Sequence, residues 1–486
     1  MQTGPVFRSC GASALLMVPP LLKFASGPLL GPAMLVGAAE RAGHTVEVLD
    51  LNARWIAQAL PAKLPWTPSP FVGDHDRDED LLRLVQERFR LTMLQHVGGE
   101  GGRALSLDAM VALQAEHDSV EHAARSIAAN EQRWITAQFG STPRPDLFCV
   151  SVLYAGQVLW ALAVTLAARE RWPGVPVVWG GAHVTALAAE IAADPRYGIA
   201  ADAFVAGYAE DTFVELLGAV ATRAPWPREC FRAGSQQWER ARADDGQIVP
   251  AFRDLHLPSG ARLTLPAQIS RGCAYGRCAF CTYPTTEGPY RELRTASAEG
   301  VIAEAIRRDA NVSFKDSLLT APLLRKVGRL VDGRLSWSGC TKLSPSLDVA
   351  MLMDLASQGC RTLEIGLETL LDEAQVLVDK RQSGDLFLRT LDAANDAGVA
   401  LVINYMTGFP GVDPSEEARC LATVASEVSA RVSLLAKIEH NHFELERGAP
   451  LSQRPPAGVR ITGQWPWSSV LGWSYEPAPG TLRVVS

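Results

Sequence analysis

Three cysteines crowd into nine residues of this chain, in the segment Ser270-Arg-Gly-Cys273-Ala-Tyr-Gly-Arg-Cys278-Ala-Phe-Cys281. Three thiolates in one tight loop can bind three irons of a [4Fe–4S] cluster and leave the fourth iron open. An open iron can chelate a ligand and hand it an electron. Structural zinc and inert thiols are the alternatives, but zinc requires four ligands and no fourth Cys or His lies nearby in the sequence. We therefore expect Cys273, Cys278 and Cys281 to hold an iron–sulfur cluster.

A repeated strand–helix pattern begins near residue 265 and positions this loop. Six repeats of about 30 residues indicate a partial (β/α)6 barrel, since too little chain remains for a closed eight-stranded one. The cysteine loop directly follows the first strand, where barrel enzymes build their active sites. We expect strands near 265–270, 311–315, 334–340, 361–367, 399–405 and 431–438, and helices at 297–308, 322–332, 347–357, 384–397 and 414–427.

The preceding chain reads as a separate α/β domain. Strand, loop, helix and strand follow one another over 13–52, and the pattern resumes at Asp146. This alternation predicts a Rossmann-like, doubly wound domain over 1–225. The predicted remainder is an insertion at 54–143, a linker at 226–260, the barrel at 261–447 and a Pro- and Trp-rich tail at 448–486 over the barrel mouth. The insertion is expected to be a helical cap, with a lid over the ligand crevice as the alternative.

Composition narrows the class of protein. The 486 residues carry 46 − 53 = −7 net charge, which argues against nucleic-acid binding. No apolar run is long enough to cross a bilayer, so no membrane association is expected. The apolar stretch after Arg8 is interrupted by Pro19 and Pro20 and does not read as a signal peptide. Nine scattered cysteines suit metal binding and buried thiols better than disulfides, which indicates a reducing cytoplasm.

The cysteine segment resembles the signature of the radical S-adenosylmethionine (SAM) superfamily. The gaps between the cysteines are four and then two residues, where three and then two is usual, and some members that also bind cobalamin carry the longer first gap. Residues 361–369 (RTLEIGLET) resemble the family's fourth strand, and 402–411 (VINYMTGFPG) its fifth strand and turn. The resemblance implies that SAM is contacted by Phe280, Asp316, Ser317, Glu368 and Gly408.

An α/β domain before such a barrel resembles the cobalamin-binding domain of the B12-dependent branch. The matching stretches are 19–28, Trp179–Thr185 and Val205–Glu210. No Asp-x-His-x-x-Gly motif is present, so the resemblance implies cobalamin without a protein histidine below cobalt. No Gly-x-Gly-x-x-Gly follows the first strand, which argues against a nicotinamide dinucleotide. The residues expected to contact cobalamin are Pro20, Leu21, Ser26, Gly180, Gly181, His183, Thr185, Gly207 and Glu210. A domain that binds nothing is the alternative.

Strand alternation suggests side chains for a substrate site. Residues two apart share a face of a strand, which groups Lys342 with Cys340 and separately groups Lys437 with Glu439. Lys342, Lys437 and Glu439 are therefore substrate-contact hypotheses, and salt bridges or solvated strand ends are the alternative for each. No catalytic side chain can be singled out.

The resemblance implies an enzyme that uses a [4Fe–4S] cluster, SAM and cobalamin. Its expected reaction is methylation of an unactivated carbon of a small molecule or short peptide, through a 5′-deoxyadenosyl radical and methylcobalamin. An external electron donor of the flavodoxin or ferredoxin type would reduce the cluster. Three alternatives stay open: rearrangement or cyclisation without methyl transfer, radical SAM chemistry with an empty first domain, and a non-catalytic iron–sulfur sensor.

Overall fold

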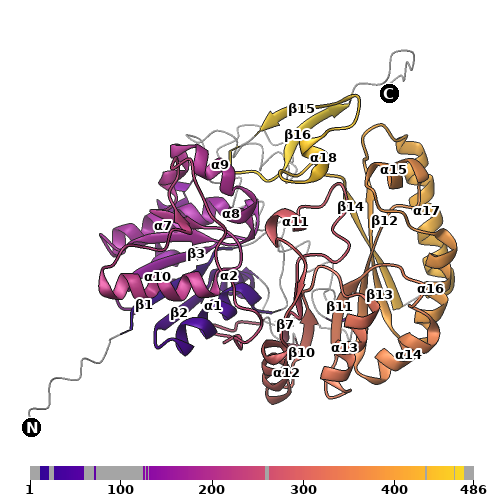
Figure 1. The fold of residues 1–486 in the computed structure, drawn as a ribbon, viewed down its shortest axis with the longest axis horizontal. Coiled ribbons are helices and arrows are strands. Elements are labelled where there is room, and N and C mark those ends of the chain that lie inside the picture. The colour runs from indigo at the N-terminus through magenta and orange to yellow at the C-terminus, as the bar shows by residue number, and fades with distance from the viewer. Residues whose placement is uncertain are drawn as a thin grey trace, which may run out of the picture.

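The computed structural model describes residues 11–20, 27–59, 71–72, 124–125, 127–129, 131–257, 262–432, 435–464 and 466–475. Two α/β domains lie side by side in Figure 1. Each is built on a six-stranded sheet. Leu21, Ser26 and most of the 54–143 insertion lie outside the described residues. No helix among the residues described combines the length and apolarity that crossing a bilayer requires.

The first sheet has the strand order β2-β1-β3-β4-β5-β6, parallel except for the β5–β6 pair. Alternate residues of β1 enter two different cores: Leu15 and Met17 pack on one face of the sheet and Ala14 and Leu16 on the other. Helices on both faces explain why the central strands β1 and β3 are mostly apolar and buried, and the predicted doubly wound domain is confirmed. The strands are β1 (Ser13–Val18), β2 (Thr45–Asp50), β3 (Leu147–Ser151), β4 (Val177–Gly180), β5 (Ala203–Val205) and β6 (Cys230–Phe231).

Around this sheet the structure describes seven α-helices. They are α1 (Leu30–Arg41), α2 (Leu51–Ala59), α6 (Gln132–Phe139), α7 (Val158–Arg171), α8 (Ala182–Ala186), α9 (Ala188–Ala193) and α10 (Glu210–Thr222). Strand β6 lies within the segment predicted as a linker, because two residues carry no periodic signal.

The second sheet has the order β7-β10-β11-β12-β13-β14, and every pairing is parallel. The predicted six-stranded partial barrel is thereby confirmed. Leu363, Ile365 and Leu401 point outward into the helices, whereas Glu364 and Asn404 face the interior. The strands are β7 (Thr264–Ala267), β10 (Asn311–Phe314), β11 (Trp337–Thr341), β12 (Cys360–Glu368), β13 (Ala400–Thr407) and β14 (Ala436–His442).

Local capping explains where the barrel helices begin and end. The Ser383 side chain accepts the Leu386 N–H at the start of α16, and Gly398 ends that helix with φ 67°. The predicted helix at 384–397 therefore has the same limits in the structure. The helices are α12 (Ala296–Arg307), α13 (Ala321–Val331), α14 (Val349–Ser357), α15 (Asp372–Leu377), α16 (Gly384–Ala397) and α17 (Pro414–Arg431).

The tail reaches both domains. Short helix α18 (Pro450–Gln453) and the antiparallel pair β15 (Val459–Gln464) and β16 (Leu471–Tyr475) lie above the barrel mouth in Figure 1. Between these strands, Trp467 is buried in the core of the first domain, with its ring 5.9 Å from Trp179 and 4.5 Å from Tyr197. The tail thus holds the domains together as well as covering the barrel.

Candidate active site

A cavity of about 1010 Å³ lies between the two domains, where the carboxyl ends of both sheets face each other. Strands β1, β3, β4 and β5 line one side, and all six barrel strands contribute to the other. Ligands of open α/β sheets and of barrels bind at these strand ends. The volume is at the upper end of the ~300–1,000 Å³ usual for small-molecule sites, so it suits a large ligand or two ligands together.

Two glycine turns form the first-domain wall. Gly181 has φ 106° and Gly207 has φ 97°, conformations that L side chains rarely adopt. The Thr185 hydroxyl donates to the Gly181 carbonyl at 2.9 Å and accepts the Gly207 N–H at 2.7 Å. Thr185 therefore fixes both turns, which present backbone to the cavity beside Gly180.

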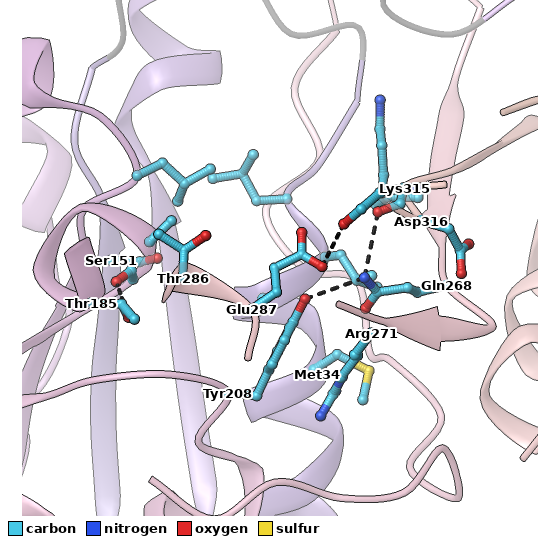
Figure 2. A pocket seen from close by; sticks show the side chains of 18 of the residues that line it. Met34, Ser151, Thr185, Tyr208, Gln268, Arg271, Thr286, Glu287, Lys315 and Asp316 are labelled. Carbon is cyan, nitrogen blue, oxygen red and sulfur yellow. Dashed lines mark hydrogen bonds between the residues drawn. The ribbon is translucent and has the colours of Figure 1, made fainter. Parts of the chain in front are cut away.

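A buried ion pair crosses from the first domain to the cysteine loop. Arg271 Nη2 lies 2.6 Å from Glu210 Oε1, and both side chains are buried. The guanidinium also stacks on the Tyr208 ring, at 3.9 Å from its centroid. Figure 2 shows Tyr208 and Gln268 in the same wall, with the Gln268 amide donating to the Tyr208 hydroxyl at 3.2 Å. The ion pair holds the first residue of α10 against Arg271, which precedes Cys273 by two positions.

Glu287 closes the base of the cysteine loop. Its Oε2 accepts the Gly272 N–H at 3.0 Å and the Ser317 hydroxyl at 2.6 Å, and its carboxyl lies on the cavity wall (Figure 2). The short strands β8 (Ser270–Arg271) and β9 (Arg291–Glu292) pair antiparallel outside the loop. From the linker, Arg240 donates to the carbonyls of Thr285 and Thr286 in α11 (Tyr283–Thr286).

Asp316 braces the strand that leads into the cysteine loop. Its carboxylate accepts the Ser270 N–H and hydroxyl, both at 2.6 Å, and the Ile269 N–H at 3.1 Å. Burial nevertheless raises the Asp316 pKa to about 7, while these hydrogen bonds oppose the rise. Asp316 and Ser317, both predicted to contact SAM, line the cavity.

Asp316→Asn is expected to remove a pH dependence of stability. The folded-state pKa of about 7 lies above the unfolded value of 3.8. The stabilising contribution of the proton is therefore complete below 3.8 and is lost as the pH rises through 7. Between pH 4 and 7 the wild-type free energy of unfolding should fall relative to Asp316→Asn, by up to ~1.4 kcal/mol per pH unit. Urea unfolding of both proteins across this pH range checks the prediction. If their free energies of unfolding changed in parallel with pH, the raised pKa of Asp316 would be contradicted.

The barrel floor carries a row of polar side chains on adjacent strands. Asn404 Nδ2 donates to Glu364 Oε1 at 2.5 Å, and Lys437 Nζ lies 3.0 Å from Glu439 Oε1. All four residues line the cavity, as does Cys340 beside them in register with Glu364. Lys437 and Glu439 thus line the cavity, where a substrate could reach them. They also form an ion pair with each other, which was the alternative to a role in substrate contact.

The three cysteines lie on a loop packed against the barrel mouth. The Cys281 N–H donates to the Cys278 carbonyl at 3.1 Å, and the Cys281 sulfur accepts the Tyr283 N–H at 3.5 Å. Burial raises the Cys281 pKa to about 12, and the neighbouring Cys278 and Cys273 thiols add to the rise. No three Cys, His, Asp or Glu side chains in the described part of the chain converge on one point. The donor set nonetheless fits a cluster with one open iron, because one nine-residue loop carries all three thiols.

Two family models match the chain in the predicted order. The B12 binding domain matches residues 110–217, and the Radical SAM superfamily matches residues 267–421. This chain is a cobalamin-dependent radical SAM enzyme. The predicted cofactor set of [4Fe–4S] cluster, SAM and cobalamin is that of this family.

The chain resembles known proteins in sequence and in fold. The chain resembles the ribosomal protein uS12 methylthiotransferase RimO of Syntrophobacter fumaroxidans, with 29% identity over 37% of this chain and 43% of that protein. The match thus spans less than half of the curated relative's length. The fold of this chain is similar to that of the radical SAM methyltransferase TsrM of Kitasatospora setae, which has been solved with cobalamin and a [4Fe–4S] cluster. The TM-score is 0.59 and the identity 15%, over 93% of this chain and 81% of that one. The fold is also similar to that of OxsB, solved with aqua-cobalamin and SAM (TM-score 0.61, 11% identity, 96% and 65%).

Seven of the twelve described residues predicted to contact SAM or cobalamin line the cavity of this radical SAM enzyme. In the B12-binding domain these are Gly180, Gly181, Thr185, Gly207 and Glu210. His183 is buried away from the cavity, its pKa is lowered to about 4 by burial, and its hydrogen-bonding neighbour is the Trp467 backbone. Pro20 is buried beside Pro19, whose carbonyl accepts the Gln157 side chain.

In the radical SAM domain, Phe280 and Gly408 lie outside the cavity lining. Phe280 packs against the group of buried hydrophobic side chains that includes Phe409 and Phe443. The Gly408 N–H donates to the buried Glu417 carboxylate at 2.9 Å. Lys342 stacks on Tyr275 of the cysteine loop, 3.9 Å from the ring centroid. Glu368 is paired with Lys380 at 2.8 Å.

Sequence reasoning missed the contacts that join the domains and brace the cysteine loop. Arg271 and Glu210 are 61 positions apart, and Glu287 and Gly272 are 15 apart, so neither pairing has a periodic signal. The one usable sign for Arg271 was its place two residues before the first cysteine, where the chain has to turn. Alternation along residues 364–368 favours an interior position for Glu364, and the same pattern on the next strand could have found Asn404.

Proposed function

We propose that this protein is a methyltransferase that methylates an unactivated carbon of a small molecule or short peptide. The observation that carries the proposal is the cavity shared by the B12-binding domain and the barrel, lined by strand ends from both. One cavity allows a ligand of each domain to face the same substrate. When bound, the cluster and SAM would supply a 5′-deoxyadenosyl radical and cobalamin would supply the methyl group.

The residues that would hold each group are distinct. Cys273, Cys278 and Cys281 would ligate the cluster, and Gly180, Gly181 and Gly207 would bring backbone against cobalamin. Asp316 and Ser317 line the cavity and would meet SAM. Phe280, Glu368 and Gly408 stay proposed SAM contacts on the family pattern alone, and Pro20, Leu21, Ser26 and His183 stay proposed for cobalamin in the same way. Lys342, away from the cavity, stays proposed on alternation alone.

The chain's own residues exclude water and orient the ligands. Arg271 with Glu210 and Arg240 with α11 would hold the domains together beside the cavity, and shielding of this kind protects reactive intermediates from solvent. Glu364, Asn404, Lys437 and Glu439 offer donors and acceptors at the barrel end, which suits a polar substrate rather than a purely apolar one. TsrM has been solved with tryptophan as substrate, and a small polar molecule of that kind would fit this proposal.

Cofactor content and product analysis test the proposal. After anaerobic purification with iron, sulfide and hydroxocobalamin, we expect about four irons and about one cobalt per chain. Incubation with SAM, an electron donor of the flavodoxin type and candidate substrates should give 5′-deoxyadenosine and a product heavier by one methyl group. Iron without cobalt would leave radical chemistry with an empty first domain. Both cofactors with an isomerised product would replace methylation by rearrangement, and zinc in place of iron would contradict the assignment.

A further inference from the structure

A buried ion pair lies where strand β12 departs from regular geometry. The register between β12 and β13 shifts between Gly366 and Glu368, and Glu368 has φ 63°, a left-handed conformation that is unfavourable for a side chain. Lys380 Nζ lies 2.8 Å from Glu368 Oε1, and both side chains are largely buried. The bulge and the strained residue thus serve to place one carboxylate against one ammonium.

Gly366 provides the space for this pair. A Cβ atom at this position would lie 2.5 Å from Lys380 Nζ and 2.7 Å from Glu368 Oε1. The backbone at Gly366 also accepts the Gln382 side-chain amide at 3.0 Å, which fixes the segment that carries Lys380. Three features of the chain therefore converge on holding Lys380 and Glu368 in one geometry.

The segment that carries Lys380 packs directly on the cysteine loop. The Ala279 N–H, between Cys278 and Cys281, donates to the Val378 carbonyl at 2.8 Å. The Tyr275 hydroxyl, between Cys273 and Cys278, donates to the Asp379 carbonyl at 2.9 Å. These two bonds tie both arms of the loop to the residues immediately before Lys380.

Stability alone does not account for a buried pair at this place. Removing two charges from water costs several kcal/mol per ion, and replacing such pairs by apolar residues is often neutral or stabilising. The potential of an iron–sulfur cluster, by contrast, responds to nearby charge and to hydrogen bonding around its sulfur ligands. A fixed charge pair next to a cluster-binding loop can therefore influence the reduction potential of the cluster.

We propose that the Lys380–Glu368 pair sets the reduction potential of the cluster on Cys273, Cys278 and Cys281, with Lys380 favouring the reduced state and Glu368 opposing it. This inference rests on the proposed function, because it requires the cluster. Reduction adds one electron from the external one-electron donor, and no bond forms or breaks. The added negative charge is stabilised by the ammonium and destabilised by the carboxylate.

Lys342, stacked on Tyr275, is a second cation beside the cysteine loop. Lys380 is the more buried of the two lysines, so its charge is the less screened by solvent.

The test is a potentiometric titration of the reconstituted protein without SAM, monitored through the electron paramagnetic resonance signal of the reduced cluster. For Lys380→Met we expect the ratio of reduced to oxidised cluster at the wild-type midpoint to fall about tenfold, or ~59 mV for a one-electron couple. Glu368→Gln should shift the potential in the opposite, positive direction. The double variant should lie between the two, and Lys380→Arg should stay close to wild type.

Lys326→Met is the matched control, because this lysine lies on α13 and pairs with the exposed Glu292. Its potential should equal that of wild type. Single variants that shift the same way, or not at all, would overturn the proposal. If Lys380→Met loses its cluster, Glu368→Gln alone still decides, since a purely structural role predicts no positive shift. A wild-type protein that binds no [4Fe–4S] cluster would instead contradict the proposed function.

Discussion

Replacing any one of Cys273, Cys278 and Cys281 with alanine is expected to abolish 5′-deoxyadenosine formation. Two thiolates cannot retain a cluster in which three irons need protein ligands and the fourth must stay open for SAM. Iron content should fall to background and the visible absorption of the cluster should disappear. Cobalamin binding should persist, because the glycine turns of the B12-binding domain do not touch these cysteines.

A cysteine outside the loop provides the control. Cys420 is half-buried on α17, which packs on the outside of the barrel sheet away from the cysteine loop, and Cys420→Ser should keep both the cluster and the activity. SAM cleavage retained in a loop variant would refute the assignment of the ligands. Activity lost in Cys420→Ser as well would indicate a general effect on folding.

The second large effect is expected at the ion pair between the domains. Arg271→Met leaves the Glu210 carboxylate buried without its cation, a change that costs about 3–5 kcal/mol when a buried pair is broken on one side. The stacking of the guanidinium on Tyr208 is lost at the same time. Chemical unfolding should therefore show a lower midpoint.

An exposed pair in the linker gives the comparison. Arg228 lies 3.0 Å from Glu239, with 78% and 50% of the two side chains exposed. Arg228→Met should change the free energy of unfolding by less than ~1 kcal/mol. Equal effects of Arg271→Met and Arg228→Met would show that the buried pair does not hold the domains together.

The fold was predictable because its strands and helices are locally regular. Parallel strands covered on both sides read as apolar runs, and α16 has its serine and glycine caps where the pattern changes. The tail was harder. Its strands β15 and β16 form an isolated antiparallel pair, and nothing local to Trp467 shows that its ring enters the core of the other domain.

The site was predictable where one loop carries it and less so where distant segments meet. The three cysteines and the glycine turns are contiguous motifs. The partner of Glu368 is twelve positions away and is brought near it by a bulge, which breaks the alternation that predicts facing residues. His183 shares a motif with Gly180 and Gly181, yet the start of α8 turns its ring into the core.

The two domains are also joined outside their linker. In the insertion, the Val72 N–H donates to Thr362 Oγ1 in β12 at 2.8 Å, and the Phe71 ring lies 5.3 Å from Lys437 Nζ. Near the other end of the chain, Trp467 fills the core of the first domain. In a chimera joined only at the linker, the barrel would therefore lose the contact from Val72 and the first domain would lose the Trp467 side chain from its core. A functional exchange of either domain would have to carry residues 71–72 and the segment around Trp467 along with it.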